Sequence, residues 1–279
     1  MKNMNSTKTT SALVVSAALA IASTGSQAAL IAYEGFNYAQ GTALNATTGG
    51  GTGWTTDWSS NSWRTNNSAF GSAQPGGSEN STGLTYANLP TVGNAARNEN
   101  SGNQNFRSFA PQAATGTYWI SFLMQKDTTN AQSSSFGISL FDGGTERNFM
   151  GNAGSSVFGV AGQGSFNSTT TVTTTPSLFL ARYNMGSGVA HFWLNSDLSA
   201  GTPANSAAFN GTGGTAFTAF TFNRVRLGMF DNPGFPNYTG SGYLDEIRIG
   251  TAFVDVVPEP SAALLGALGG LMLLRRRRA

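Results

Sequence analysis

The sequence predicts an all-β body, a two-sheet antiparallel β-sandwich, flanked by an N-terminal signal helix and a short C-terminal transmembrane helix. Three observations predict it. Apolar and polar residues alternate over many short segments, which is the period of a half-buried strand. Glycine supplies 36 of the 279 residues and favours turns and bulges. The only apolar runs that favour helices lie at the two ends of the chain.

Alternation is clearest in the second half of the body. It predicts strands at 118–124, 136–141, 157–160, 178–183, 189–194, 220–230 and 243–249. Asp142-Gly143-Gly144 is a hairpin signal, and residues 184–188 predict another turn. We expect residues 252–256 to pair as an edge strand.

The first half of the body is less regular. Residues 30–36 predict the opening strand. From 41 to 105 the chain is mostly Gly, Ser, Thr and Asn, and a structureless loop of that length is uncommon in a compact domain. We therefore expect short strands at 53–59, 84–89 and 106–109. Many short strands, turn clusters and no helices predict one sandwich domain over residues 29–255.

Residues 1–28 have the three regions of a secretory signal peptide. Lys2 and Lys8 form a positive start, and an apolar run follows from Ala12 to Ala22. Small residues then precede a predicted cleavage after Ala28. The run is too short to span a bilayer, which needs roughly 20 apolar residues. We therefore expect the protein to be exported.

Residues 256–279 form a second addressing segment. An uncharged run from Ala262 to Leu274 reaches only about 20 Å as a helix, so snorkelling arginines would have to extend it across a ~30 Å hydrocarbon core. Basic residues after a span favour a cytoplasmic C-terminus, which leaves the body outside. The residues that carry this pattern are Val257, Pro258, Glu259 and Pro260 before the run, and the membrane stop Arg275, Arg276, Arg277 and Arg278 after it.

This tail resembles the PEP-CTERM sorting signal of Gram-negative bacteria. The resemblance implies that exosortase, a membrane protease-transpeptidase, recognises the tail. It also implies anchoring in the inner membrane before processing, followed by a place at the cell surface or in the extracellular matrix with polysaccharide as a partner. A plain apolar tail anchor is the alternative.

The body itself resembles laminin-G/concanavalin-A-like jelly rolls. The segments that carry this likeness are 242–250 (GYLDEIRIG) and the hairpin 178–194 leading into 223–230. The resemblance covers residues 117–254 and implies a jelly-roll sandwich.

Composition excludes several classes of function. Between residues 29 and 257 there are nine basic and twelve acidic residues, a net charge of about −3, so no basic stripe for nucleic acid is present. The chain has no cysteine and one histidine, which excludes a disulfide framework, a thiolate metal site and a multi-histidine metal centre.

No catalytic residue is predicted. Glycoside hydrolases with this sandwich carry a Glu-x-Asp-x-x-Glu pattern, which is absent. Asp245 and Glu246 are adjacent and should point to opposite faces of a strand. We expect Asp245 to be partly buried against a loop, and Glu246 to form an exposed pair with Arg248. His191 lies mid-strand with no nucleophile-elbow motif, as a surface or cross-strand residue.

Two binding hypotheses remain open. Trp54, Trp58 and Trp63, with Tyr86, either stack on sugar rings or plug the core or edge of the sandwich. Loop oxygens at Asp142-Gly143-Gly144 and at Asp231-Asn232-Pro233-Gly234 either bind Ca²⁺ or serve as ordinary turns. No other metal and no cofactor is predicted.

The leading hypothesis is therefore an exported, envelope- or matrix-associated surface protein that is not an enzyme. The second is a carbohydrate-binding module with a defined sugar site. The third is a polysaccharide hydrolase or lyase.

Overall fold

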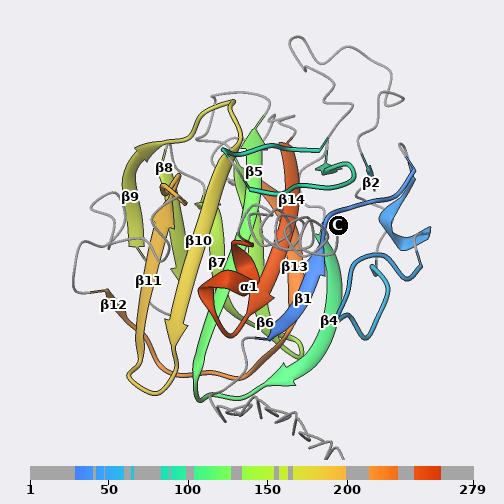
Figure 1. Ribbon diagram of the computed structural model, residues 1–279. Coiled ribbons are helices and arrows are strands. Elements are labelled where there is room, and N and C mark those ends of the chain that lie inside the picture. The colour runs from blue at the N-terminus through green and yellow to red at the C-terminus, as the bar shows by residue number, and fades with distance from the viewer. Residues whose placement is uncertain are drawn as a thin grey trace, which may run out of the picture.

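The fold was determined as a computed structural model. It describes residues 29–39, 42–46, 48–59, 64–65, 83–87, 89–98, 104–126, 134–153, 157–162, 166–198, 214–231 and 242–258. Within these residues fourteen strands form two antiparallel sheets, and helix is limited to two short turns (Figure 1). The predicted two-sheet antiparallel sandwich is confirmed. The predicted signal helix and transmembrane helix lie outside the described residues.

The eight-stranded sheet has the order β12-β11-β10-β5-β14-β3-β2, and β1 pairs with β14 beside this path. Every pairing in it is antiparallel. The strands are β1 (Leu30–Glu34), β2 (Arg64–Thr65), β3 (Ala96–Asn98), β5 (Thr117–Lys126), β10 (Ser177–Asn184), β11 (Val189–Leu194), β12 (Thr215–Ala216) and β14 (Gly242–Gly250).

The six-stranded sheet has the order β4-β13-β6-β7-β8-β9. The predicted hairpin at Asp142-Gly143-Gly144 joins two of its strands. Its strands are β4 (Gln104–Gln112), β6 (Ser134–Asp142), β7 (Thr145–Ala153), β8 (Val157–Gly162), β9 (Phe166–Thr171) and β13 (Phe222–Asp231).

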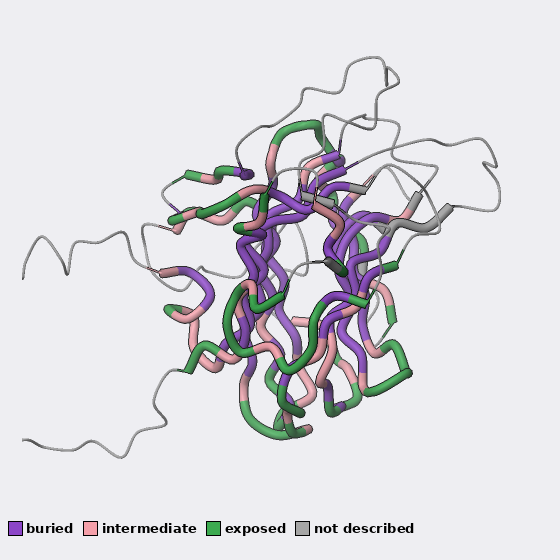
Figure 2. The backbone as a smooth tube through the Cα atoms, turned by 90° about the vertical axis from the view of Figure 1, so that its right-hand side faces the viewer, coloured by how far each residue is buried: buried purple, intermediate pink, exposed green. Residues whose placement is uncertain are grey.

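The core lies between the two sheets, where side chains of one parity from each strand meet. Ile120, Phe122 and Met124 of β5 belong to it, as the alternation predicts. The tube in Figure 2 shows buried residues concentrated in the strands and exposed residues in the connections. The sandwich is therefore built on the period-two pattern of the sequence.

A second apolar cluster, called here the outer cluster, covers the other face of the eight-stranded sheet. It explains why β5 is buried on both faces rather than on one. Residues of the loop 83–95 and of the C-terminal turn supply its outer layer. Its members are Leu84, Leu89, Ala95, Trp119, Leu123, Leu178, Leu180, Trp193, Tyr243, Val256 and Val257.

Three expected strands are wrong. Residues 252–256 form the short helix α1 (Phe253–Val256), because the Asp255 carboxylate accepts the N–H groups of Thr251 and Ala252, at 3.0 and 2.8 Å, and caps the turn. Residues 53–59 contribute only a bridge at Trp54, and the described residues within 84–89 form no strand. A 3-10 turn, η1 (Leu44–Ala46), is the other helical segment. None of the helices in the described ranges is long and apolar enough to cross a membrane.

Candidate functional site

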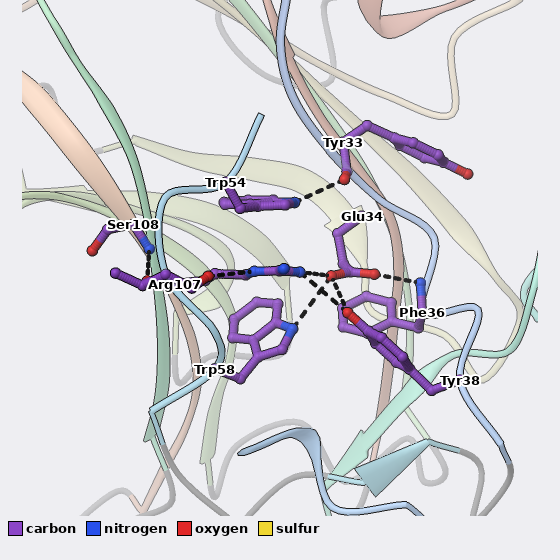
Figure 3. Close-up of polar contacts among 9 residues, drawn as sticks. Tyr33, Glu34, Phe36, Tyr38, Trp54, Trp58, Arg107 and Ser108 are labelled. Carbon is purple, nitrogen blue, oxygen red and sulfur yellow. Dashed lines mark hydrogen bonds and ion pairs between the residues drawn. The ribbon is translucent and has the colours of Figure 1, made fainter. Parts of the chain in front are cut away.

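A buried ion pair joins the two sheets at one edge of the sandwich. Glu34 ends β1 of the eight-stranded sheet, and Arg107 lies on β4 at the edge of the six-stranded sheet. Their side chains are 0% and 3% exposed and form a salt bridge (Figure 3). Glu34 shares the core-facing parity of Ala32, so the pair bridges the interior of the sandwich.

The Glu34 carboxylate is an acceptor for four groups. Besides Arg107, it accepts the Phe36 N–H at 2.8 Å, the Tyr38 hydroxyl at 2.8 Å and the Trp58 indole N–H at 3.3 Å. Burial raises the pKa of Glu34, and the Arg107 charge and these hydrogen bonds oppose that rise. With its lone pairs already occupied, this carboxylate is suited to hold the seam between the sheets.

The tryptophans proposed for sugar stacking line the same seam. Trp58 is 3% exposed and stacks on Phe36, so its ring faces are covered. Trp54 is partly buried, donates its indole N–H to the Tyr33 carbonyl at 2.8 Å, and has the Arg107 guanidinium 5.0 Å from its ring centroid. Trp63 lies outside the described residues. Of the three tryptophans in the stacking hypothesis, only Trp54 is both described and partly exposed.

Asp245 and Glu246 do not point to opposite faces. The register of β14 against β5 shifts between Asp245 and Arg248, and Glu246 has a φ of 51°, which marks a β-bulge. Both carboxylates therefore meet the loop that precedes β3. Asp245 accepts the Leu84 N–H at 2.8 Å, and Glu246 accepts the Val92 N–H at 2.8 Å.

The Glu246–Arg248 pair is buried rather than exposed. The two side chains lie 2.6 Å apart, at 0% and 9% exposure, because the loop 83–95 covers them. Tyr33 donates to Glu246 at 3.1 Å, and burial together with the Glu246 charge raises the pKa of Tyr33. Burial and the Glu246 charge also raise the pKa of Asp245, whose expected hydrogen bond to a loop is confirmed. This second group of carboxylates fastens the loop to the sheet.

His191 is buried on the outer face of the eight-stranded sheet. Its ring stacks on Trp193 with centroids 5.8 Å apart, and Arg182 is its cross-strand neighbour on β10. Of the two expectations for His191, a surface residue or a cross-strand residue, the structure supports the second. Residues 191 and 193 share a parity, so the contact with Trp193 follows from the strand pattern, whereas the partner Arg182 was not predicted.

The proposed calcium loops are described only in part. Asp142 accepts from Arg147 at 2.7 Å and from the Thr221 hydroxyl at 2.7 Å, and these hydrogen bonds lower the pKa of Asp142. Residues 232–234 and the Asp231 side chain lie outside the described part. In the part that is described, no group of three or more His, Asp or Glu side chains is placed to hold a metal ion.

The first residue of the predicted sorting motif, Val257, lies inside the described fold. Val256 and Val257 are 0% and 5% exposed and belong to the outer cluster. The Ser121 hydroxyl donates to the Val256 carbonyl at 2.7 Å, which ties this end to β5. Pro258 is partly buried, and Glu259, Pro260 and Arg275 to Arg278 lie outside the described residues, as does Ala28.

Comparison with known proteins finds no family model and no curated protein that matches the chain. Solved structures do match in part. A sialidase is 10% identical with a TM-score of 0.39 over 58% of this chain and 16% of its own. Alginate lyase AlgAT5 from polysaccharide lyase family 7 is 10% identical with a TM-score of 0.38 over 56% and 77%.

The binding domain of botulinum neurotoxin DC, in complex with rat synaptotagmin II, is 11% identical with a TM-score of 0.40 over 63% of this chain and 43% of its own. The chain thus spans only 16% of the sialidase and under half of the toxin domain.

Proposed function

We propose that this chain is an exported, envelope- or matrix-associated surface protein without enzymatic activity, sorted through its Pro258-Glu259-Pro260 tail by an exosortase-type membrane protease. The body is a β-sandwich, and we propose that it is a jelly roll of the laminin-G/concanavalin-A-like kind. The signal peptide ending at Ala28 directs export, and the apolar tail anchors the chain before processing.

The observation that carries this proposal is the packing of Val256 and Val257 in the outer cluster. The folded body holds the chain through Val257, the first residue of the predicted sorting motif, and Pro258-Glu259-Pro260 follow directly. A membrane-bound protease that recognises the motif would therefore cleave the chain directly after the folded domain. Cleavage beyond Val257 leaves the apolar contacts of the body intact.

The buried carboxylates support a non-enzymatic body. Glycosidic chemistry uses one carboxyl group that exchanges its proton and a second that faces the substrate. Here the carboxylates of Glu34, Asp245 and Glu246 accept hydrogen bonds from the protein. Release of reducing ends or unsaturated products from a polysaccharide panel by the purified full-length chain would favour the hydrolase or lyase hypothesis instead.

The test of sorting is mass spectrometry of the mature C-terminus. The full chain is expressed in a host with an exosortase-type enzyme and in the same host without it. We expect a C-terminus near Pro258–Ser261 only with the enzyme, and a retained Ala279 in the Pro258→Ala/Pro260→Ala variant. Pro176→Ala, a loop proline of the body, is the matched control. A retained Ala279 in every strain, or a cytosolic chain, refutes the proposal.

A further inference from the structure

Arg182 lies on an aromatic shelf on the outer face of the eight-stranded sheet. It belongs to β10, between β5 and β11 (Figure 1), and its direct neighbours there are Trp119 and His191. Its guanidinium carbon lies 5.5 Å from the Trp119 ring centroid and 5.7 Å from that of Trp193. The two indoles stack 5.6 Å apart with planes within 13°. The two indole rings therefore hold the guanidinium against the outer face of the sheet.

The surroundings of the Arg182 guanidinium differ from those of four other arginines in the body. Arg107, Arg147, Arg226 and Arg248 each form an ion pair with a carboxylate. Over the described ranges, the Arg182 guanidinium contacts the two indole rings but forms neither an ion pair nor a hydrogen bond. Burial alone lowers its pKa, which fits a partly buried cation without a compensating carboxylate.

Such a cation is suited to bind a planar anion. A guanidinium held against aromatic rings can still donate from the N–H groups on its edge, and their spacing matches the two oxygens of a carboxylate. Partial burial strengthens the attraction because the local dielectric is lower than that of water. A single cation balances a single negative charge, which favours a carboxylate over a doubly charged phosphate.

An aromatic residue beside the shelf offers an apolar contact. Phe253 of α1 is partly buried and meets Trp119 edge to face, with ring centroids 5.4 Å apart. The C–H face of a sugar can pack on such a ring while its carboxylate reaches the cation. The geometry points to a binding site at Arg182 for the carboxylate of an acidic oligosaccharide, an inference that rests on the proposed place of this protein in a polysaccharide matrix.

The test is calorimetric titration of the purified full-length chain in mild detergent with a tetramer of galacturonate. The same tetramer with methyl-esterified carboxylates is the neutral probe. We expect binding of the acid form at least tenfold tighter than of the ester. Arg182→Gln should weaken acid binding at least tenfold, and Arg182→Lys should weaken it because the planar fork is lost.

Arg224→Gln is the matched control. Arg224 is also a partly buried arginine stacked on an aromatic ring, 4.0 Å from the Phe106 centroid, but on the six-stranded sheet. Its removal should leave binding unchanged. Equal weakening by both variants would mean that net charge alone attracts the probe. Melting curves confirm folding, and Arg182→Gln should melt no lower than the wild type because it removes an uncompensated charge.

Three outcomes overturn the inference: equal binding of acid and ester, competition by inorganic phosphate or sulfate as strong as by the tetramer, or binding of polyglutamate in preference to it. These outcomes are separate from the sorting proposal. The C-terminal mass of Arg182→Gln should show normal processing, so a failure of sugar binding leaves the sorting result standing, and the reverse also holds.

Discussion

Lys126 gives the sharpest test of the energetics of this fold. It ends β5 on the core-facing parity of Met124, is fully buried, and donates from Nζ to Asn152 Oδ1 on β7 at 3.2 Å. Burial lowers its pKa from 10.5 to about 8. The unfolded chain therefore binds this proton more tightly than the folded one, so the free energy of unfolding rises as pH increases from about 8 to about 10.5.

The size of the effect follows from the two pKa values. Below pH 8 the charged ammonium costs about 3 kcal/mol of stability, at roughly 1.4 kcal/mol per pKa unit. Integrated from pH 7 to 9.5, the stability gained is about 2 kcal/mol. Four tyrosines, Tyr33, Tyr86, Tyr118 and Tyr183, have raised pKa values and oppose this gain increasingly as pH approaches 10, their ordinary pKa. The useful window therefore ends near pH 9.5.

The assay is urea unfolding of the full-length chain, followed by tryptophan fluorescence, at several pH values between 7 and 9.5. Lys126→Met should flatten the pH dependence. At pH 7 it should stabilise the protein by about 2 kcal/mol, because the roughly 1 kcal/mol hydrogen bond to Asn152 is lost while the charge is removed. Gln125→Met, one residue earlier on β5, should keep the wild-type slope. A flat wild-type curve, or an equally steep one in Lys126→Met, refutes the reasoning.

Three further predictions concern the ion pair between the sheets, a glycine in β7 and stability below pH 7. Arg107→Met should cost about 3–5 kcal/mol in urea unfolding, because Glu34 stays buried without its cation. Arg147→Met removes one partner of a partly exposed pair and should cost under about 1 kcal/mol, and equal costs for the two variants would contradict this. Gly151→Ala should cost about 2–4 kcal/mol, since φ at Gly151 is 142° and an added Cβ would lie 2.4 Å from the Phe136 carbonyl oxygen. Gly144→Ala, where an added Cβ meets open space, should change the melting curve little, and an unchanged melting curve for Gly151→Ala would contradict the prediction. Because burial raises the pKa values of Glu34 and Asp245, the folded state holds their protons more tightly, and stability should rise as pH falls from 7 through these raised values; a steady loss from pH 7 to 5 in unfolding titrations would argue against it.

Most of the second half of the fold follows from local pattern, although β7, β9 and the short β12 were not predicted. Strands β5, β6, β10, β11, β13 and β14 were all predicted, because their alternation reports which face is buried. The first half follows less well, because its segments bond to strand edges and side chains rather than to one another. Thr55 and Ser59 donate to the Ser108 and Phe106 carbonyls of β4, and Leu84 donates to the Asp245 side chain.

The buried ion pair, the bulge and the buried lysine were missed for different reasons. Glu34 and Arg107 are 73 residues apart, and nothing local to either residue indicates the other. The bulge at Asp245 and Glu246 places a non-glycine residue at positive φ, which a period-two reading does not reveal. The burial of Lys126 could have been predicted from the sequence, because its parity on β5 is that of Tyr118, Ile120 and Met124.

The polar residues of the interior have a common role that bears on function. Glu34 with Arg107, Lys126 with Asn152 and Tyr183 with Asn148 each bridge the two sheets, the last at 2.6 Å. Bridges of this kind fix how one sheet lies on the other, since a shift of either sheet would leave buried polar groups unsatisfied. A body held in this way keeps its outer faces rigid. In the site proposed at Arg182, this rigidity would reduce the conformational entropy that the side chain loses when it binds a carboxylate.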